Sequence, residues 1–202
     1  MSEIVVVHGY VGSGKSTQCS RLASDGLDGV RVQHISAGNR LRAIRTGGEA
    51  SEFSQYINAP DAPSPLPDWV VEGTIFEPLD NSDDTLALID GYPRHPEAVE
   101  SFHETVSRRR HKLLGTIAMQ LPMDISVDRI VARGKRDGER LQGEDLREFA
   151  KHRYQLDTQT TNLAIDALRR IALTRFVDAS GDIPTVHSRF VEEIKHLRQQ
   201  NG

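Results

Sequence analysis

The chain has a single cysteine, few aromatic residues and no long apolar run. Cys19 is the only cysteine among 202 residues; we interpret it as a buried helix residue, and it excludes an internal disulfide and a four-cysteine zinc site. The longest apolar runs, such as residues 4–7 and 86–89, fall far short of the roughly 20 residues that cross a membrane. No basic segment precedes the run that begins at residue 4, so no signal peptide is visible. We therefore expect a cytoplasmic protein that has no membrane partner and binds no zinc.

The chain also lacks an excess of positive charge. Its net charge is −4, which argues against nucleic acid as a partner but allows a local basic pocket for phosphates. Its charged and apolar fractions, 27% and 37%, are ordinary for a folded globular protein. With 202 residues the chain can bury a core as one domain, and we expect a monomer.

Short apolar runs alternate with longer amphipathic stretches, which is the pattern of a parallel sheet with crossover helices. The predicted strands cover residues 4–8, 30–34, 85–90, 113–120 and 174–178. The predicted helices cover residues 15–24, 38–46, 67–76, 96–109, 123–133, 144–171 and 184–199. Two stretches, residues 58–67 and 134–143, interrupt this rhythm, and we expect them to be mobile segments over the sheet. The sequence thus predicts an α/β fold with a five-stranded parallel sheet.

A glycine-rich segment follows the first predicted strand directly and fits the pattern GxxxxGK[ST]. It reads Gly9-Tyr-Val-Gly-Ser-Gly14-Lys15-Ser16. In such a loop, small residues let backbone N–H groups surround phosphate oxygens, the lysine adds a positive charge, and the serine can ligate magnesium. The alternative is a glycine turn with a solvated lysine, but a chance match in a chain of this length has a probability on the order of one percent. We therefore predict a P-loop, a motif that ATPases, GTPases and kinases share.

A second segment with polar chemistry lies where another predicted strand ends. Asp90 closes that strand, and Gly91-Tyr92-Pro93-Arg94 follows it, at the kind of position where α/β proteins bind ligands. Asp90 can hold magnesium through water, since this cation keeps most of its hydration. Arg94 would then project toward a substrate phosphate, which its planar guanidinium suits. From these residues alone, a capped turn with a surface arginine is an equal alternative.

Adenylate kinases and the related UMP/CMP kinases carry a GF/YPR motif at this place, and the chain resembles them, in order, over nearly its whole length. His34-Ile-Ser-Ala-Gly38-Asn-Arg-Leu-Arg42 is similar to their HxSTGDxLR motif. Further similar segments are Leu66-Pro67-Asp68 (LVPDE), Arg129-Ile-Val-Ala-Arg133-Gly134 (RxxxRG), the lid arginines Arg140 and Arg153, and Val177-Asp178-Ala179-Ser180-Gly181 (a VDA turn). The resemblance implies a P-loop three-layer α/β/α fold with small lid and nucleoside monophosphate (NMP)-binding segments.

The resemblance also implies how the chain is divided. A single kinase domain would comprise a core of residues 1–34, 80–133 and 144–202, an NMP-binding segment of about residues 35–79 and a short lid of about residues 134–143. Closure of the lid would exclude water, which would otherwise hydrolyse ATP. The paired aspartates that usually follow the first lid arginine are absent from residues 141–145, so closure is expected to differ in detail.

The same resemblance assigns roles to individual residues. Catalytic roles fall to Lys15, Arg94, Arg133, Arg140 and Arg153. The residues expected to bind ATP are Gly9, Val11, Gly12, Ser13, Gly14, Lys15, Ser16, Thr17, Arg129, Arg133 and Gly181, with Arg129 stacking on the adenine. The residues expected to bind the acceptor are Ala37, Gly38, Arg42, Leu66, Pro67, Gly91, Arg94, Glu97, Arg140 and Arg153. Magnesium, bound together with ATP, would contact Ser16 and, through water, Asp90.

The arginines also fit this chemistry on physical grounds. Transfer of a γ-phosphoryl group passes through a loose transition state, so the protein mainly positions two anions and neutralises their charge. Arg129 and Arg133 lie four residues apart, so on a helix they face one side, where like charges are unfavourable unless an anion lies between them. A solvated helix face is the alternative, and it suits Lys135, Arg136 and residues 108–110 better than the arginines of the predicted site.

Several residues depart from the family pattern. Val11 stands where the family has proline, Ser16 where adenylate kinases have glycine, Ala37 where they have threonine, and Asn39 where they have aspartate. Glu97 replaces a glutamine that reads the adenine of AMP. Because a carboxylate only accepts hydrogen bonds, Glu97 favours a base edge rich in donors. The identity of the acceptor base therefore stays open.

Three functions are compatible with the sequence. The first is ATP-dependent phosphorylation of an NMP, with AMP or dAMP the leading acceptor and CMP or UMP next. The second is phosphorylation of another small metabolite on the same scaffold, which Ala37, Glu97 and the proline-rich residues 58–67 would support. The third, a nucleotide-binding module without turnover, ranks last because it would need no acceptor arginines such as Arg42 and Arg94.

Overall fold

The sheet of this protein lies at the centre of a three-layer structure. The computed structural model describes residues 1–82, 84–137 and 143–201. It contains a sheet of five parallel strands in the order β2-β3-β1-β4-β5. These are β1 (Glu3–Gly9), β2 (Val32–Ser36), β3 (Leu86–Asp90), β4 (Lys112–Gln120) and β5 (Thr174–Asp178). The predicted α/β fold with a five-stranded parallel sheet is confirmed.

The central strand β1 is apolar from Ile4 to Val7 because both of its faces are covered. Val5 and Val7 belong to the core on one face of the sheet, and Ile4 and Val6 to the core on the other, as the alternation of side chains along a strand requires. From β1 the chain goes to the edge strand β2, returns to β3 and then crosses to β4 on the far side of β1. This reversal beside β1 opens a crevice at the carboxyl ends of the strands, where α/β proteins bind ligands.

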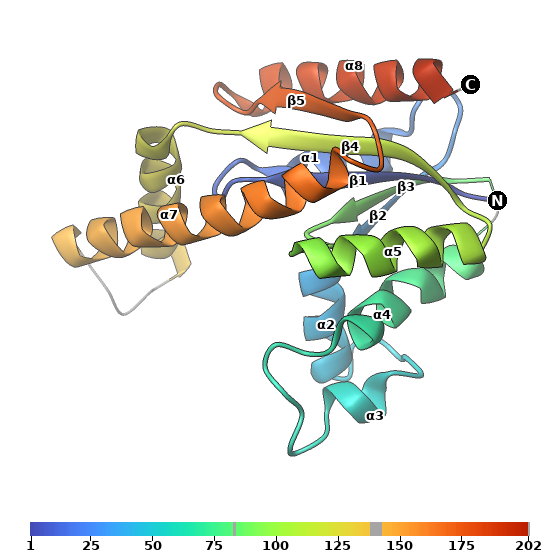
Figure 1. Ribbon diagram of the computed structural model, residues 1–202. Helices are drawn as coiled ribbons and strands as arrows, with labels where there is room; N and C mark the ends of the chain where they lie inside the picture. The colour runs from blue at the N-terminus through green and yellow to red at the C-terminus, as the bar shows by residue number, and fades with distance from the viewer. Residues whose placement is uncertain (83, 138–142, 202) are drawn as a thin grey trace.

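Helices cover both faces of the sheet (Figure 1). On one face, α1 (Lys15–Asp25) and α8 (Ile183–Asn201) contribute buried side chains such as Cys19 and Phe190 to the core. On the other face, α4 (Asp68–Asp80), α5 (Pro96–Arg108) and α7 (Gly143–Leu168) close the second core, for example through Phe76 and Phe102. The prediction that Cys19 is a buried helix residue is confirmed. Within the described residues, no helix combines the length and apolar character needed to span a bilayer.

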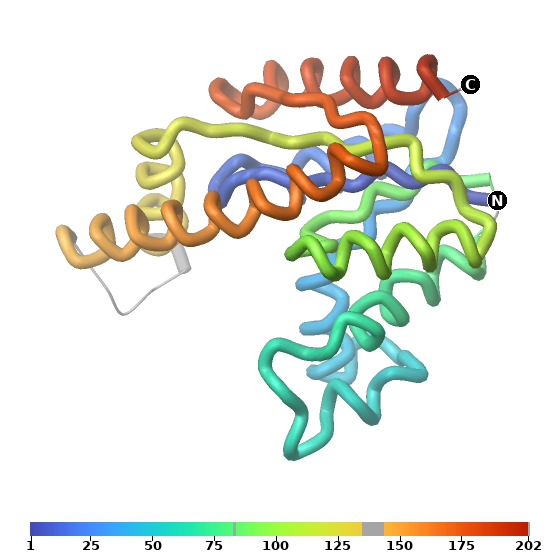
Figure 2. The backbone as a smooth tube through the Cα atoms, viewed as in Figure 1, coloured from blue at the N-terminus to red at the C-terminus, as the bar shows by residue number. Residues whose placement is uncertain are grey.

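Two parts of the chain project from this core, as Figure 2 shows. The first consists of α2 (Ala37–Arg45), α3 (Ser54–Ile57) and the start of α4, and it has a small apolar core of its own made by Ile44, Ile57, Leu66 and Val70. The second consists of α6 (Met123–Asp137) and the start of α7, which pack through Val127, Ile130 and Ala150. The division of the chain into core, NMP-binding segment and lid remains a prediction, and these separate small cores support it.

Some element bounds differ from those predicted. The strand expected at residues 30–34 is β2, Val32–Ser36, because Leu27 and Val30 pair in a tight turn and the ladder with β3 continues to Ser36. Helix α4 continues past the expected end at residue 76 and through Pro78, because the buried Leu79 holds its last turn in the core. The short helix α3 was not predicted.

The bounds around the predicted lid also differ. Helix α6 continues beyond the expected end at Arg133 to Asp137, with Gly134 buried within it, so the first residues of the predicted lid are helical. Helix α7 ends at Leu168 rather than at residue 171, where turns replace the last predicted residues. The rest of the predicted lid, residues 138–142, which includes Arg140, lies outside the described residues.

Candidate functional site

The P-loop joins β1 to α1 and has the backbone that its glycines permit. Gly12 and Gly14 have φ angles of 79° and 83°, in the left-handed region that glycine adopts without a steric penalty. Gly9 packs so closely on β4 that an added Cβ would lie 2.6 Å from the carbonyl oxygen of Met119. Any side chain at Gly9 would therefore displace the loop from the sheet.

Two neighbouring helices hold the P-loop from outside. From α6, the Ser126 hydroxyl donates a hydrogen bond of 2.6 Å to the carbonyl oxygen of Val11. From α7, the Asp157 carboxylate accepts a hydrogen bond of 2.7 Å from the N–H of the same Val11. Asn162, also on α7, accepts one of 3.1 Å from the hydroxyl of Tyr10. The middle of the loop is thus fixed by residues more than a hundred positions away in the sequence.

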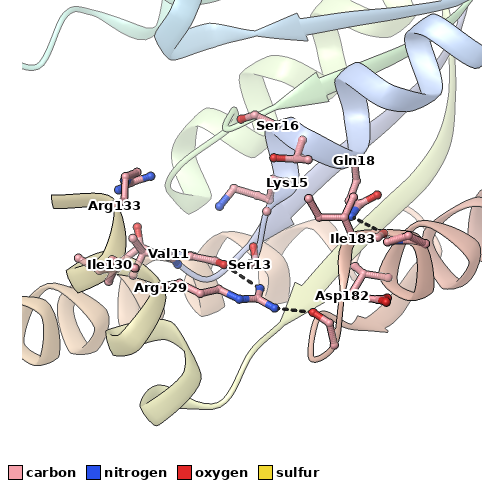
Figure 3. Close-up of a pocket in the computed structure, with 18 of the residues that line it drawn as sticks. Val11, Ser13, Lys15, Ser16, Gln18, Arg129, Ile130, Arg133, Asp182 and Ile183 are labelled. Atoms are coloured by element: carbon pink, nitrogen blue, oxygen red, sulfur yellow. Dashed lines mark hydrogen bonds between the residues drawn. The ribbon is translucent and has the colours of Figure 1, made fainter. Parts of the chain in front are cut away.

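Arg129, on α6, connects the P-loop to the turn after β5. Its guanidinium donates hydrogen bonds to the carbonyl oxygens of Gly12 at 3.0 Å, Ala179 at 3.2 Å and Gly181 at 2.9 Å. Figure 3, a close-up of a cavity, shows this side chain extending from α6 past the P-loop toward the turn that carries Asp182. The guanidinium of Arg129 therefore links the P-loop to the turn after β5.

This cavity, the loop cavity, has a volume of about 870 Å³. All the residues predicted to bind ATP line it except Gly9. It is lined by Val11, Gly12, Ser13, Gly14, Lys15, Ser16, Thr17, Gln18, Arg129, Ile130, Ala132, Arg133, Arg153, Asp157, Gly181, Asp182, Ile183, Pro184 and Val186. Its lining therefore combines the positive, N–H-rich start of α1, charged side chains of α6 and α7, and apolar side chains from the start of α8.

Beyond the P-loop, the Ser16 hydroxyl donates a hydrogen bond of 2.5 Å to Oδ2 of Asp90 at the end of β3. The imidazole of His34 lies 3.4 Å from the same carboxylate oxygen and 3.0 Å from the hydroxyl of Ser20. Burial of Asp90 opposes its ionisation, but hydrogen bonds from His34 and Ser16 and the charge of Lys15 outweigh burial and hold the pKa of the carboxyl below its usual value. Asp90 is therefore an oriented carboxylate.

A second cavity, the strand-end cavity, adjoins the first and has a volume of about 630 Å³. It is lined by His8, Gly9, Lys15, Gly91, Arg94, Phe149, His152, Arg153, Leu156, Asp157, Thr160 and Thr161. Its cations, Lys15, Arg94 and Arg153, come from α1, the loop after β3 and α7. Lys15, Arg153 and Asp157 line both cavities. The two cavities therefore meet at the end of β1.

Lys15 stands at this junction. Its ammonium lies 2.5 Å from the carbonyl oxygen of Gly9, and burial lowers its pKa, while the carboxylates of Asp90 and Asp157 act in the opposite direction. The two nearby carboxylates therefore stabilise the positive charge of Lys15, although its side chain is partly buried.

Arg94 is oriented by the loop that carries it. Its Nε donates a hydrogen bond of 2.9 Å to the carbonyl oxygen of Gly91, and Gly91 has a φ of 81° that suits glycine. The loop is anchored by Tyr92, whose hydroxyl donates a 2.8 Å hydrogen bond to the buried Glu72 of α4. Glu72 also accepts one of 3.1 Å from Thr105 of α5. The anchored loop leaves the arginine side chain itself exposed toward the cavity.

Other residues predicted to bind the acceptor lie outside both cavities. Arg42 is exposed and hydrogen-bonds to its neighbour Asn39. Glu97 is exposed and lies 3.0 Å from His95, whose other ring nitrogen lies 3.3 Å from Asp68 of α4. The remaining four are Ala37, Gly38, Leu66 and Pro67, all in the first projecting part or at its edge.

Sequence reasoning missed several residues of the strand-end cavity. His8 was interpreted only as the end of an apolar strand, and its imidazole is 5% exposed, with Nε2 lacking a hydrogen-bond partner among the described residues. The others, on α7, are Phe149, His152, Leu156, Asp157, Thr160 and Thr161. A usable signal was their spacing, since residues 149, 153, 156 and 160 recur at helical intervals from Arg153.

Comparisons with known proteins agree with this geometry. The adenylate kinase family model matches residues 7–172. An adenylate kinase of Rhodopirellula baltica is 29% identical over 189 residues, which cover 93% of each chain. An adenylate kinase of Campylobacter jejuni is 27% identical over 200 residues, covering 98% of this chain and 99% of its own. The UMP-CMP kinase of Gallus gallus is 27% identical over 197 residues, covering 94% and 95%. Because the family match includes the P-loop, β3 and the arginines of α6 and α7, the chain belongs to the adenylate kinase family.

Proposed function

We propose that the protein transfers the γ-phosphoryl group of ATP to a nucleoside monophosphate, giving ADP and a nucleoside diphosphate. The observation that carries this proposal is the junction of two cavities at Lys15 and Arg153. A triphosphate seated in the loop cavity would extend its terminal phosphate toward this junction. A monophosphate in the strand-end cavity would approach the junction from the other side, beside Arg94.

The charges around the junction match the needs of this reaction. Phosphoryl transfer requires two anionic reactants to be held in line while positive groups stabilise the charge on the migrating phosphoryl oxygens. The cavities together bring five cationic side chains into one region of a chain whose net charge is −4. They are Lys15, Arg94, Arg129, Arg133 and Arg153. Such a concentration of positive charge is costly unless anions occupy the cavities.

Each group then has a distinct task. The backbone N–H groups of residues 12–17 hold the donor phosphates at the positive end of α1, and Arg129 would stack on the donor base. Arg133 and Arg153 stabilise the migrating phosphoryl group, and Arg94 grips the acceptor phosphate. The acceptor roles of Arg42 and of Arg140, like the lid itself, remain part of this proposal.

The same geometry suits magnesium. The Ser16 hydroxyl and the Asp90 carboxylate lie 2.5 Å apart beside the loop cavity, and oxygen ligands of this kind are those that magnesium prefers. Among the described residues, no group of three or more His, Cys, Asp or Glu side chains could hold a metal alone. Magnesium would supply charge neutralisation for the phosphates, and Ser16 and Asp90 would hold it.

For the acceptor we propose AMP first and CMP or UMP next. The relatives named adenylate kinase and UMP-CMP kinase resemble the chain to a similar degree, so the phosphate site is supported more strongly than the base site. The exposed Glu97, at the start of α5 beyond Arg94, is the residue that we propose to influence the choice of base.

A coupled assay of ADP formation, with ATP, magnesium and a panel of nucleoside monophosphates, tests the proposal. We expect strong stimulation by AMP or by a pyrimidine monophosphate and slow ATP hydrolysis without an acceptor. Tight ATP binding with no stimulation by any member of the panel would refute kinase activity toward these acceptors. Stimulation only by other phosphate-accepting metabolites would instead support phosphorylation of another small metabolite on the same scaffold.

A further inference from the structure

The contact between Asp157 and Val11 joins the P-loop to α7. Oδ2 of Asp157 accepts a hydrogen bond of 2.7 Å from the N–H of Val11, across 146 positions of the sequence. A carboxylate that accepts from a backbone N–H forms a charge-assisted hydrogen bond, about twice as strong as one between neutral groups. Val11 is 8% exposed and belongs to the same small apolar core as Ala150 of α7. The loop and the helix are therefore joined by a hydrogen bond and by a shared apolar core.

Asp157 also lies at the junction of the two cavities. It lines both of them, together with Lys15 and Arg153. Arg153 is four residues earlier on α7, so the two side chains lie on the same side of the helix. The residue that holds the P-loop is thus one helical turn from an arginine that lines both cavities.

A negative charge in this position needs an explanation. At short range, a carboxylate repels the phosphates that Lys15 and Arg153 attract. Its presence therefore weakens anion binding unless it contributes something that outweighs the repulsion. Besides supporting the charge of the neighbouring Lys15, Asp157 makes such a contribution through the hydrogen bond to Val11, because this bond fixes the P-loop relative to the helix that carries Arg153.

We propose that Asp157 is a positioning residue for phosphoryl transfer, which clamps the P-loop to α7 through the N–H of Val11 and so sets the distance between the donor phosphates and Arg153. The inference rests on the proposed kinase function. It explains why the P-loop and Arg153, which lines both cavities, can keep one geometry although they belong to elements far apart in the chain. It also gives a role to Val11, whose N–H a proline at this position would lack.

A double-mutant cycle isolates this hydrogen bond. Asp157→Ala removes the acceptor, Val11→Pro removes the donor, and Val11→Ala keeps the donor while shortening the side chain. With kcat measured at saturating ATP and AMP, we expect Asp157→Ala and Val11→Pro each to lower kcat about tenfold or more, the worth of one charge-assisted hydrogen bond. The double variant Val11→Pro/Asp157→Ala should be no slower than either single variant. The cycle of Val11→Ala with Asp157→Ala should instead be additive.

Two more variants separate positioning from other roles. Asp157→Asn keeps an oxygen acceptor but loses the charge, so we expect a kcat between those of the wild type and Asp157→Ala. Asp166→Asn, an exposed position on the same helix, removes an equal charge and should leave kcat unchanged. Additive losses in both cycles, or a kcat for Asp157→Asn as low as that of Asp157→Ala, would overturn the clamp. The clamp would also be overturned if Asp157→Ala lowered the melting temperature but left kcat unchanged.

A measurement that needs no turnover separates failure of this inference from failure of the proposed function. If the clamp is present, hydrogen exchange at the Val11 amide should be slow in the wild type and at least about tenfold faster in Asp157→Ala, while the amides of α8 keep their protection. Equal exchange in the two proteins would refute the clamp. A wild-type chain that fails to phosphorylate any NMP but shows this difference in exchange would refute only the kinase activity and the role in transfer that depends on it.

Discussion

The hydroxyl of Ser16 donates a hydrogen bond of 2.5 Å to Oδ2 of Asp90, although the two residues are 74 positions apart. Ser16 lies in the first turn of α1, and Asp90 is the last residue of β3, so the contact joins the P-loop to the neighbouring strand. His34, from the edge strand β2, approaches the same carboxylate oxygen. Three elements of the chain therefore converge on one carboxylate beside the loop cavity.

From this contact we expect Ser16→Ala and Asp90→Asn to impair the use of magnesium. Each variant should lower kcat at least about a hundredfold, the usual effect of losing one group that stabilises charge in the transition state, and should raise the magnesium concentration needed for half-maximal rate. The measurement is ADP formation over a magnesium titration. Ser20→Ala, one turn along α1, removes the partner of His34 without touching Asp90, and it serves as the matched control. A normal magnesium profile in Asp90→Asn would remove Asp90 from the proposed site.

Arg94→Ala should abolish transfer while leaving ATP affinity nearly unchanged, because Arg94 lines only the strand-end cavity. We expect a loss in kcat/KM for the acceptor of at least about a hundredfold. ATP affinity is measured separately by calorimetry without an acceptor. Arg45→Ala, an exposed arginine of α2 that lines neither cavity, controls for the loss of one positive charge. Equal losses of ATP binding and of transfer in Arg94→Ala would show that this arginine belongs to the donor site.

Glu97→Gln should shift the acceptor preference toward AMP. An amide both donates and accepts hydrogen bonds, so it can pair with the adenine edge where a carboxylate can only accept. Glu97 now lies 3.0 Å from His95, and we expect a change of a few fold in the ratio of kcat/KM for AMP over CMP. The replacement of Glu100, which is also exposed and lies on the same helix, by Gln is the control. An unaltered ratio would show that Glu97 does not select the base.

His8 should make the folded protein less stable in acid. Burial, followed by the charge of Lys15, lowers the pKa of His8 to about 4, and Asp90 and Arg94 also act on it in opposite directions. Since the folded pKa lies below the unfolded value of 6.5, the unfolded chain takes up this proton first as the pH falls. Stability is therefore complete above about pH 6.5 and is lost progressively down to about pH 4, by about 2 kcal/mol at pH 5.

The check is urea unfolding of the wild type and of His8→Leu at pH 7 and pH 5. The fall in the free energy of unfolding between these two pH values should be about 2 kcal/mol smaller in the variant. His103→Leu replaces an exposed histidine of α5 and should reproduce the wild-type fall. If the free energy of unfolding of His8→Leu falls between pH 7 and pH 5 by as much as that of the wild type, His8 takes up its proton near the unfolded pKa and is not the source of the acid sensitivity.

The P-loop and the strands could be predicted because their signals are local. The glycines at positions 12 and 14 stand where the backbone has positive φ, and the run at the start of the chain is buried on both faces of the sheet. Arg129 was also predicted at the donor site, and it lies in the wall of the loop cavity. For the loop and the strand, the residues that determine the geometry are adjacent in the sequence, whereas the role of Arg129 was predicted from the family resemblance and its contacts are with distant residues.

The acceptor side was harder to predict because its residues come from separate elements. His8 has no local feature that distinguishes it from an ordinary strand residue, and Asp157 belongs to a long amphipathic helix. Arg42 was predicted to grip the acceptor phosphate, and it is exposed and bonded to Asn39. A helical pattern shows which residues share a face, but not which other element that face meets.

By itself, the sequence determined the order of strands and helices, the phosphate-binding loop and the resemblance that suggested a kinase. These depend on backbone preferences and on the spacing of side chains along a continuous stretch of chain. Only the tertiary structure decided that Lys15, Arg153 and Asp157 meet between two cavities, and that Asp157 holds Val11. The physical reason is that such a junction forms where the packing of the sheet and its helices brings distant segments together, and the packing of whole elements is not encoded in any one of them.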